Sequence, residues 1–149
     1  MEATIDQQTL TISFERSLAA SPAEVFDAWT HPEQVAQWWD PTGTPLRACE
    51  SDLRPEGAFR FENGDHSPPF TGVYKVVERP TRLVFEALGS VGTVSLRAEG
   101  EKTRMRVTIR CASQEHLEHF VRLGVATNTD RTLDNLVCYV AARARSRAS

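Results

Sequence analysis

Two histidines, His116 and His119, stand three residues apart beside Glu115 in a segment with helical character. At that spacing two imidazoles lie on one face of a helix, which is how a zinc site can begin. Two ligands are too few to hold the ion, so an amphipathic, solvent-facing helical turn is the favoured interpretation. We expect no metal and no cofactor. The other histidines, His31 and His66, are expected in a turn and in a loop.

The three cysteines, Cys49, Cys111 and Cys138, are widely spaced and form no C-x-x-C pair. This argues against a disulfide framework and favours reduced, buried thiols. None has a neighbourhood that would activate a thiolate, and the chain has neither a G-x-S-x-G nucleophile elbow nor a glycine-rich phosphate loop. The sequence therefore predicts no catalytic nucleophile.

Asn128, Arg131 and Asn135 follow at i, i+3 and i+7, so they share one face of a helix. That face is either solvated or a polar strip inside a cavity, where it would orient a carbonyl or carboxylate of a ligand. Acid–base catalysis by Asn128, Arg131 or Glu62 stays open, although these residue types are too common to be a signal.

Trp38 and Trp39 pose a packing question, because neighbouring side chains on a helix point about 100° apart. We expect one indole to be buried against the preceding helix. The other is expected to cover the surface or to border a pocket entrance, where an amphipathic ring is well suited. Further aromatic residues recur at strand spacing, as core or as a cavity wall: Phe59, Phe61, Phe70, Tyr74 and Phe85.

The elements that position these side chains begin with a strand over 10–18, where apolar and polar residues alternate. The segment SPAE, starting at Ser21, is a capping box that opens a short helix. That helix ends before Pro32, because the residue before a proline is pushed out of the helical region. A second short helix is expected from Pro32 to Trp38 or Trp39.

Between 45 and 112, short runs rich in Val, Phe, Tyr, Leu and Thr alternate with turn signals, which predicts a meander of strands. With the first strand the total is about seven. The expected strands lie near 46–53, 58–62, 70–78, 83–87, 92–99 and 104–110.

From 112 to about 144 the sequence is helix-compatible, which predicts a long C-terminal helix. Its apolar stripe changes phase between 117–124 and 133–140, and a straight helix would bury only one of the two. We therefore expect a break or kink between Gly124 and Asp130, with one of the polar residues 127–129 as a new N-cap.

The chain has 149 residues, a net charge of −3 and 40% hydrophobic residues, which suits one globular domain. We expect that domain to span 1–149, with its core at about 10–142. The small, evenly spread charge argues against nucleic acid, and no apolar run reaches the ~18 residues of a membrane span. Because the N-terminus lacks signal-peptide features, a cytoplasmic location is expected.

Five stretches, taken with the order of the elements, carry a resemblance to a known family: SPAEVFDAW from Ser21, PEQVAQWWDP from Pro32, DLRPEGAFRF from Asp52, FTGVYKVVERPTRLVF from Phe70 and GTVSLRAEGEKTRMRVTI from Gly92. The chain resembles the SRPBCC, or START-like, superfamily, and within it the branch named after the C-terminal domain of the activator of a heat-shock chaperone ATPase. The resemblance implies an α+β helix-grip (START-like, Bet v 1-like) fold. In that fold a curved antiparallel sheet grips a long C-terminal helix, with a ligand cavity between them.

Function does not follow from the fold alone. The leading hypothesis is a small-molecule binding module whose partner is a hydrophobic or aromatic compound with one polar end. The alternatives are an enzyme on the same scaffold, such as a polyketide cyclase or aromatase, and a chaperone-associated interaction protein; a homodimer is left open. Family members commonly carry an aromatic residue where this chain has Ala87. The candidate ligand-contacting residues are Trp38, Trp39, Phe59, Phe61, Phe70, Tyr74, Phe85, Phe120, Asn128 and Arg131.

Overall fold

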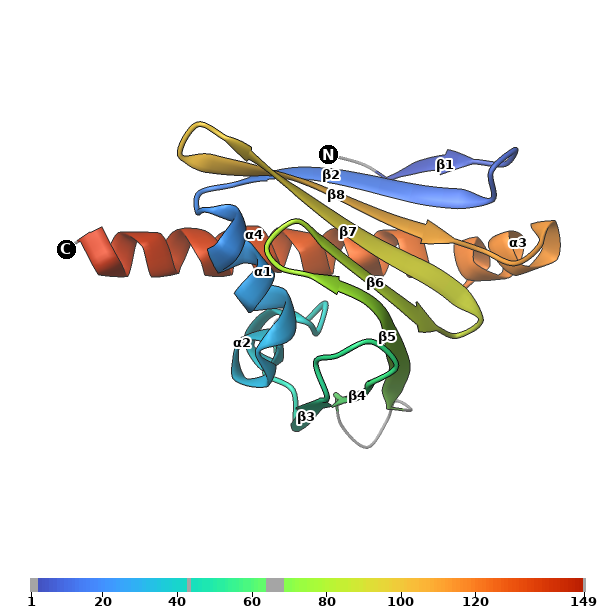
Figure 1. Ribbon diagram of the computed structural model, residues 1–149. Coiled ribbons are helices and arrows are strands. Elements are labelled where there is room, and N and C mark those ends of the chain that lie inside the picture. Colours follow the sequence, from blue (N-terminus) through green and yellow to red (C-terminus); the bar gives the residue numbers. More distant parts are fainter. Residues whose placement is uncertain (1–2, 43, 64–68, 149) are drawn as a thin grey trace.

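The computed structural model describes residues 3–42, 44–63 and 69–148, without the side chains of 145–148. The loop residue His66 lies outside the described residues, as does most of the turn expected at 63–65. Over the described ranges, one antiparallel sheet and four helices make up the fold (Figure 1).

The sheet has eight strands in the order β1-β2-β8-β7-β6-β5-β4-β3, and every neighbouring pair is antiparallel. It curves along its length, so that β3 and β4 lie below the rest in Figure 1. The predicted α+β class with a curved antiparallel sheet is confirmed. The strands are β1 Thr4–Asp6, β2 Thr11–Leu18, β3 Ala48–Ser51, β4 Ala58–Glu62, β5 Phe70–Glu78, β6 Arg82–Ala87, β7 Ser90–Glu99 and β8 Lys102–Arg110.

Two short helices, α1 Pro22–Thr30 and α2 Pro32–Trp38, follow β2, as the sequence predicts. Ser21 caps α1, because its hydroxyl oxygen accepts a hydrogen bond of 3.3 Å from the backbone N–H of Glu24. His31 separates the two helices in an extended conformation, with φ −82° and ψ 120°, which is the conformation that a following proline favours.

The prediction of about seven strands is too low by one, because β1 was missed. All of its side chains are exposed, so the alternation of buried and exposed residues that identifies a strand is absent there. The strand expected over 46–53 is also shorter. Leu46 precedes it and donates its backbone N–H to the carbonyl of Ala36 in α2, at 2.8 Å.

The C-terminal segment forms two helices, α3 Gln114–Arg122 and α4 Val125–Ala148, so the predicted interruption is confirmed. It falls at Gly124, whose φ of 79° is a left-handed conformation that glycine adopts without a steric penalty. The expected cap within 127–129 is wrong, since α4 already starts at Val125 and the N–H of Asn128 donates to the carbonyl of Gly124 at 2.9 Å. No helix in the described ranges is both long and apolar enough to cross a membrane.

Helix α4 runs across one face of the sheet (Figure 1). The core between them consists of alternate residues of β2 and a stripe of α4, all buried: Ile12, Phe14, Leu18, Leu133, Leu136 and Val140. Arg16 lies on the same inner face of β2 and is only 5% exposed. Its guanidinium contacts two carboxylates of α4, Asp130 at 2.9 Å and Asp134 at 3.2 Å. The sheet and α4 are therefore joined by an ion pair whose guanidinium is buried in the apolar layer and whose carboxylates reach solvent.

Candidate functional site

The two neighbouring tryptophans, Trp38 and Trp39, lie in different environments. Trp38 is 1% exposed, and its indole N–H donates to the carbonyl of Ala28 in α1 at 3.0 Å. Its ring meets that of Trp29 edge-on, with centroids 4.9 Å apart. The expectation that one indole is buried against the first helix is confirmed, and Trp38 is that residue. As a candidate ligand contact, however, Trp38 lies in the core and not on a pocket wall.

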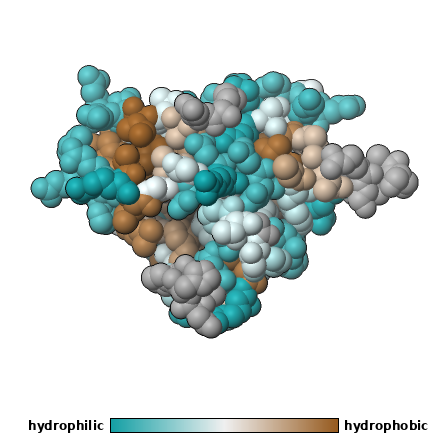
Figure 2. Space-filling view, turned by 180° about the vertical axis from the view of Figure 1, so that it is seen from behind, coloured by the Kyte–Doolittle hydropathy of each residue, from teal (hydrophilic) through white to brown (hydrophobic). Residues whose placement is uncertain are grey.

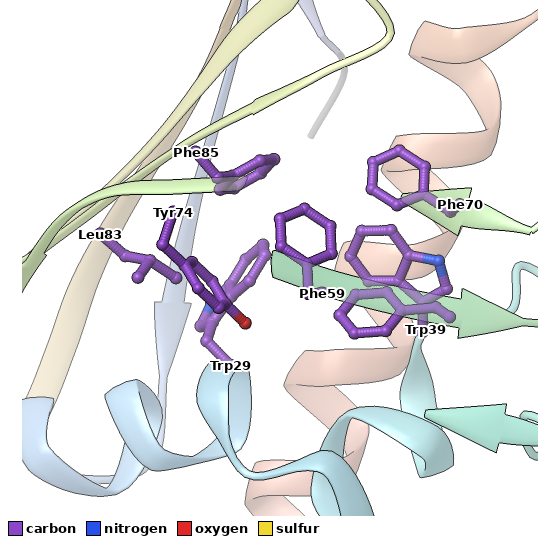
Figure 3. Close-up of a pocket in the computed structure, with 8 residues that line it drawn as sticks. Trp29, Trp39, Phe59, Phe70, Tyr74, Leu83 and Phe85 are labelled. Carbon is purple, nitrogen blue, oxygen red and sulfur yellow. The ribbon is translucent and has the colours of Figure 1, made fainter. Parts of the chain in front are cut away.

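Trp39 is half-buried. Because its backbone is still helical, its indole points away from α1 and toward β4 and β5. Its ring centroid lies 5.0 Å from that of Phe61 and 5.1 Å from that of Phe70. Phe59 stands in the middle of this aromatic group, with Trp39 and Phe70 on one side and Tyr74 and Phe85 on the other (Figure 3).

This aromatic cluster is packed nearly solid. The space it encloses is about 10 Å³, enough for a single water molecule at most. Burial raises the pKa of Tyr74 to about 12, so the phenol stays neutral and protonated. Phe59, Phe61 and Tyr74 therefore form the base of the site and leave no room for a ligand among themselves.

A larger pocket of about 290 Å³ lies beside the cluster, between the sheet and the first half of α4. This volume is at the lower end of the range for small-molecule sites. Of the candidate residues, its wall contains Trp39, Phe70, Phe85, Phe120 and Asn128. Arg131 is exposed and stands off the wall.

The floor of the pocket consists of small residues at the paired ends of β6 and β7, namely Ala87, Ser90 and Gly92. The Phe85 ring lies directly over Gly92, since a Cβ added at this glycine would come within 2.5 Å of the ring. Sequence reasoning singled out Ala87 only as a departure from the family pattern and missed Gly92 altogether. No local signal marks a glycine that supports a ring on the neighbouring strand.

Gly92→Ala is expected to lower the free energy of unfolding by about 1–3 kcal/mol, because the Phe85 ring must leave its place over the glycine. In the double variant Gly92→Ala/Phe85→Leu the shorter side chain relieves the clash, so most of the loss caused by Gly92→Ala should disappear. Urea unfolding of the four proteins of this double-mutant cycle measures the coupling. Strictly additive effects would show that the ring does not depend on Gly92.

The pocket mouth carries exposed apolar side chains. Leu88, 63% exposed, lines it from the turn between β6 and β7. Leu123, 61% exposed, does not line the pocket but follows α3, two residues before the wall residue Val125. Figure 2 shows apolar residues gathered at the end of the molecule where α3 lies. Leu88 has a φ of 54° and precedes Gly89 at 77°, so the turn holds a leucine in a left-handed conformation that favours glycine or asparagine.

His116 anchors this turn. Its Nδ1 accepts a hydrogen bond of 3.0 Å from the N–H of Ala112, which leaves the proton on Nε2, and Nε2 donates to the carbonyl of Leu88 at 3.1 Å. Both ring nitrogens are thus engaged, and the imidazole also packs edge-on against Phe120 at 4.4 Å. His119 is exposed, and the described residues contain no cluster of three or more potential metal ligands.

Polar residues of α4 hold the loop that follows α2. Thr132 donates its hydroxyl to the carbonyl of Trp39 at 3.0 Å, and Asn135 donates to the carbonyl of Asp40 at 2.9 Å. The predicted polar strip is therefore divided: Asn128 lines the pocket, Asn135 braces the loop, and Arg131 faces solvent.

Among the described residues no titratable side chain lines the pocket, although His116 contacts the wall residues Leu88 and Phe120. Glu62 does not line the pocket, and its hydrogen bond with Arg60 at 2.6 Å holds the pKa of its carboxyl below the usual range. Burial raises the pKa of Cys49 to about 11, and burial also raises that of Cys111, so both remain thiols. Among the described residues the pocket wall consists of apolar side chains and neutral hydrogen-bonding groups.

A curved antiparallel sheet that grips a long C-terminal helix places the protein in the helix-grip class of α+β folds. The family model described as Activator of Hsp90 ATPase homolog 1-like protein matches residues 19–141, most of the chain. The chain belongs to this family, which confirms the resemblance found in its sequence motifs. No curated protein sequence matches the chain.

Solved structures share the fold at low sequence identity. Protein NE0264 from Nitrosomonas europaea is 20% identical with a TM-score of 0.83, over 95% of this chain and 99% of that one. A protein from Arthrobacter aurescens is 19% identical with a TM-score of 0.82, over 95% and 91% of the two chains. The AHSA1-like protein from Aeromonas hydrophila is 28% identical with a TM-score of 0.74, over 90% and 94%.

Proposed function

We propose that this protein binds a small apolar or aromatic molecule between the sheet and α4. The observation that supports this most is the pocket of about 290 Å³, whose wall is mainly aromatic and aliphatic with a few neutral polar groups. Concave, largely apolar sites with few polar groups are typical of small-molecule recognition. Membership of a START-like family is consistent with such a scaffold.

Ligand binding agrees with the site better than the alternatives do. An acid–base enzyme needs a group that exchanges protons near neutral pH, and the described wall has no carboxylate, imidazole, amine or thiol. The family description names activation of the Hsp90 ATPase, an activity that would rest on a protein contact and would not require an apolar interior wall.

The expected effect of filling the pocket tests this proposal. Ala87→Phe places a ring into the open space above the floor, so binding of a neutral naphthalene dye should weaken by at least about tenfold, or 1.4 kcal/mol. The matched control is Val91→Phe, which puts the same ring on the opposite face of the same hairpin. Dye fluorescence titrations compare the three proteins, and native mass spectrometry of the purified wild type tests for a co-purifying ligand.

Equal dye affinity in wild type and Ala87→Phe would contradict the proposal, because the dye would then bind elsewhere. Loss of affinity in Val91→Phe as well would indicate a general effect on folding. The unfolding midpoint of each variant in urea checks this second outcome.

A further inference from the structure

We propose that the ligand of this pocket is electrically neutral, with rings at its inner end and a hydrogen-bonding group at its outer end; this inference rests on the proposed function. The observation behind it is the charge of the wall. No Asp, Glu, Lys, Arg or His lines the pocket among the residues that the structure describes.

A charged ligand would therefore lose its hydration on entry and find no counter-ion among the described residues of the wall. Transfer of an ion into an apolar site is strongly unfavourable unless it is paired, whereas a neutral ring gains from leaving water. Arg131 is close in sequence to the wall residues Asn128 and Thr132, but it faces solvent and does not line the pocket.

The polar groups of the wall are arranged for a neutral partner. Two hydroxyl protons are already committed to the protein, that of Ser90 to the carbonyl of Ala87 at 2.8 Å and that of Thr132 to the carbonyl of Trp39 at 3.0 Å. The side chains of Asn128 and Thr129, one turn further toward the start of α4, form no hydrogen bond with any described residue.

An asparagine side chain offers one acceptor oxygen and two donor hydrogens, and a threonine hydroxyl offers both functions. Such a pair suits a carbonyl, hydroxyl or amide on the ligand. Asn128 is exposed, whereas the wall residue Trp29 is buried, so the polar end of the ligand would lie at the mouth and its rings inside.

One feature of the site would favour an anion. Helix α4 begins at Val125, which lines the pocket, and the unpaired N–H groups of a first helical turn carry a partial positive charge. The experiment must therefore compare a neutral ligand with its anionic counterpart.

Two dyes of the same ring system make this comparison: N-phenylnaphthylamine is neutral, and anilinonaphthalene sulfonate adds one sulfonate. Fluorescence titration of the wild-type chain at physiological ionic strength should give a dissociation constant at least about tenfold lower for the neutral dye. Ala87→Phe should abolish this preference, because it fills the pocket in which the preference arises.

Asn128→Lys supplies the missing cation at the mouth and should strengthen binding of the sulfonate dye by at least about tenfold, with little change for the neutral dye. Thr127→Lys is the matched control, since it adds the same charge to an exposed neighbour that does not line the pocket. Equal or tighter binding of the sulfonate dye by wild type, lost in Ala87→Phe, would overturn the neutral-ligand inference and leave the pocket standing. Binding of neither dye would overturn the proposed function itself.

Discussion

Replacement of Trp38 by alanine is expected to lower the free energy of unfolding by about 3–5 kcal/mol, the range for large-to-small changes in a core. The indole is 1% exposed, packs edge-on against Trp29, and donates its N–H to the carbonyl of Ala28. Alanine would leave a cavity between α1 and α2 and a carbonyl without its partner. Urea unfolding followed by circular dichroism measures the loss without relying on tryptophan emission.

Trp39→Ala is the matched comparison one residue along the chain. Trp39 is half-buried, and the hydrogen bond from Thr132 goes to its backbone carbonyl, which alanine retains. The expected loss is therefore smaller, about 1–2 kcal/mol. The neutral dye should bind more weakly to Trp39→Ala, because this indole forms part of the pocket wall. Equal destabilisation by both changes, with dye affinity unaltered, would show that the pair is ordinary core.

Replacement of Arg16 by alanine is the change with the second largest expected effect, a loss of about 2–4 kcal/mol in the free energy of unfolding. Arg16 sits among apolar residues of β2 and contacts Asp130 and Asp134 of α4. Its removal leaves a cavity and takes the guanidinium from Asp130, whose side chain is 24% exposed and keeps a hydrogen bond of 3.3 Å from the N–H of Ala3. The lower part of the range for a broken buried pair applies because water can still reach both carboxylates.

Arg16→Met separates packing from charge. Methionine restores most of the volume of the aliphatic stem, so the difference between the Met and Ala variants reports packing, and the difference between wild type and Met reports the ion pair. We expect the packing part to be the larger. If Arg16→Met unfolds as easily as Arg16→Ala in urea, the charge contributes most of the stability and this explanation of the ion pair is wrong.

The sequence predicts those helices and strands whose boundaries are set by residues close by in the chain. The capping box at Ser21 and the proline at position 32 delimit α1 and α2, and β4 and β5 agree with the predicted ranges to the residue. The alternation of β2 also places Arg16 on the inner face, although its carboxylate partners lie more than a hundred residues later in the chain. Strand β1 was missed because an exposed strand of three residues has no alternation to detect.

The pocket is different, because only the tertiary structure decides where empty space remains. Aromatic spacing left both a core and a cavity wall open for Phe59, Phe61 and Tyr74, and in the structure these rings pack against one another and close that region. The open volume lies where the small residues Ala87 and Gly92 face α4. A sequence pattern determines which face of a helix or strand is apolar. A cavity depends on the distance between two such faces in the folded protein. Long-range contacts set that distance, so it cannot be deduced from the sequence of either element alone.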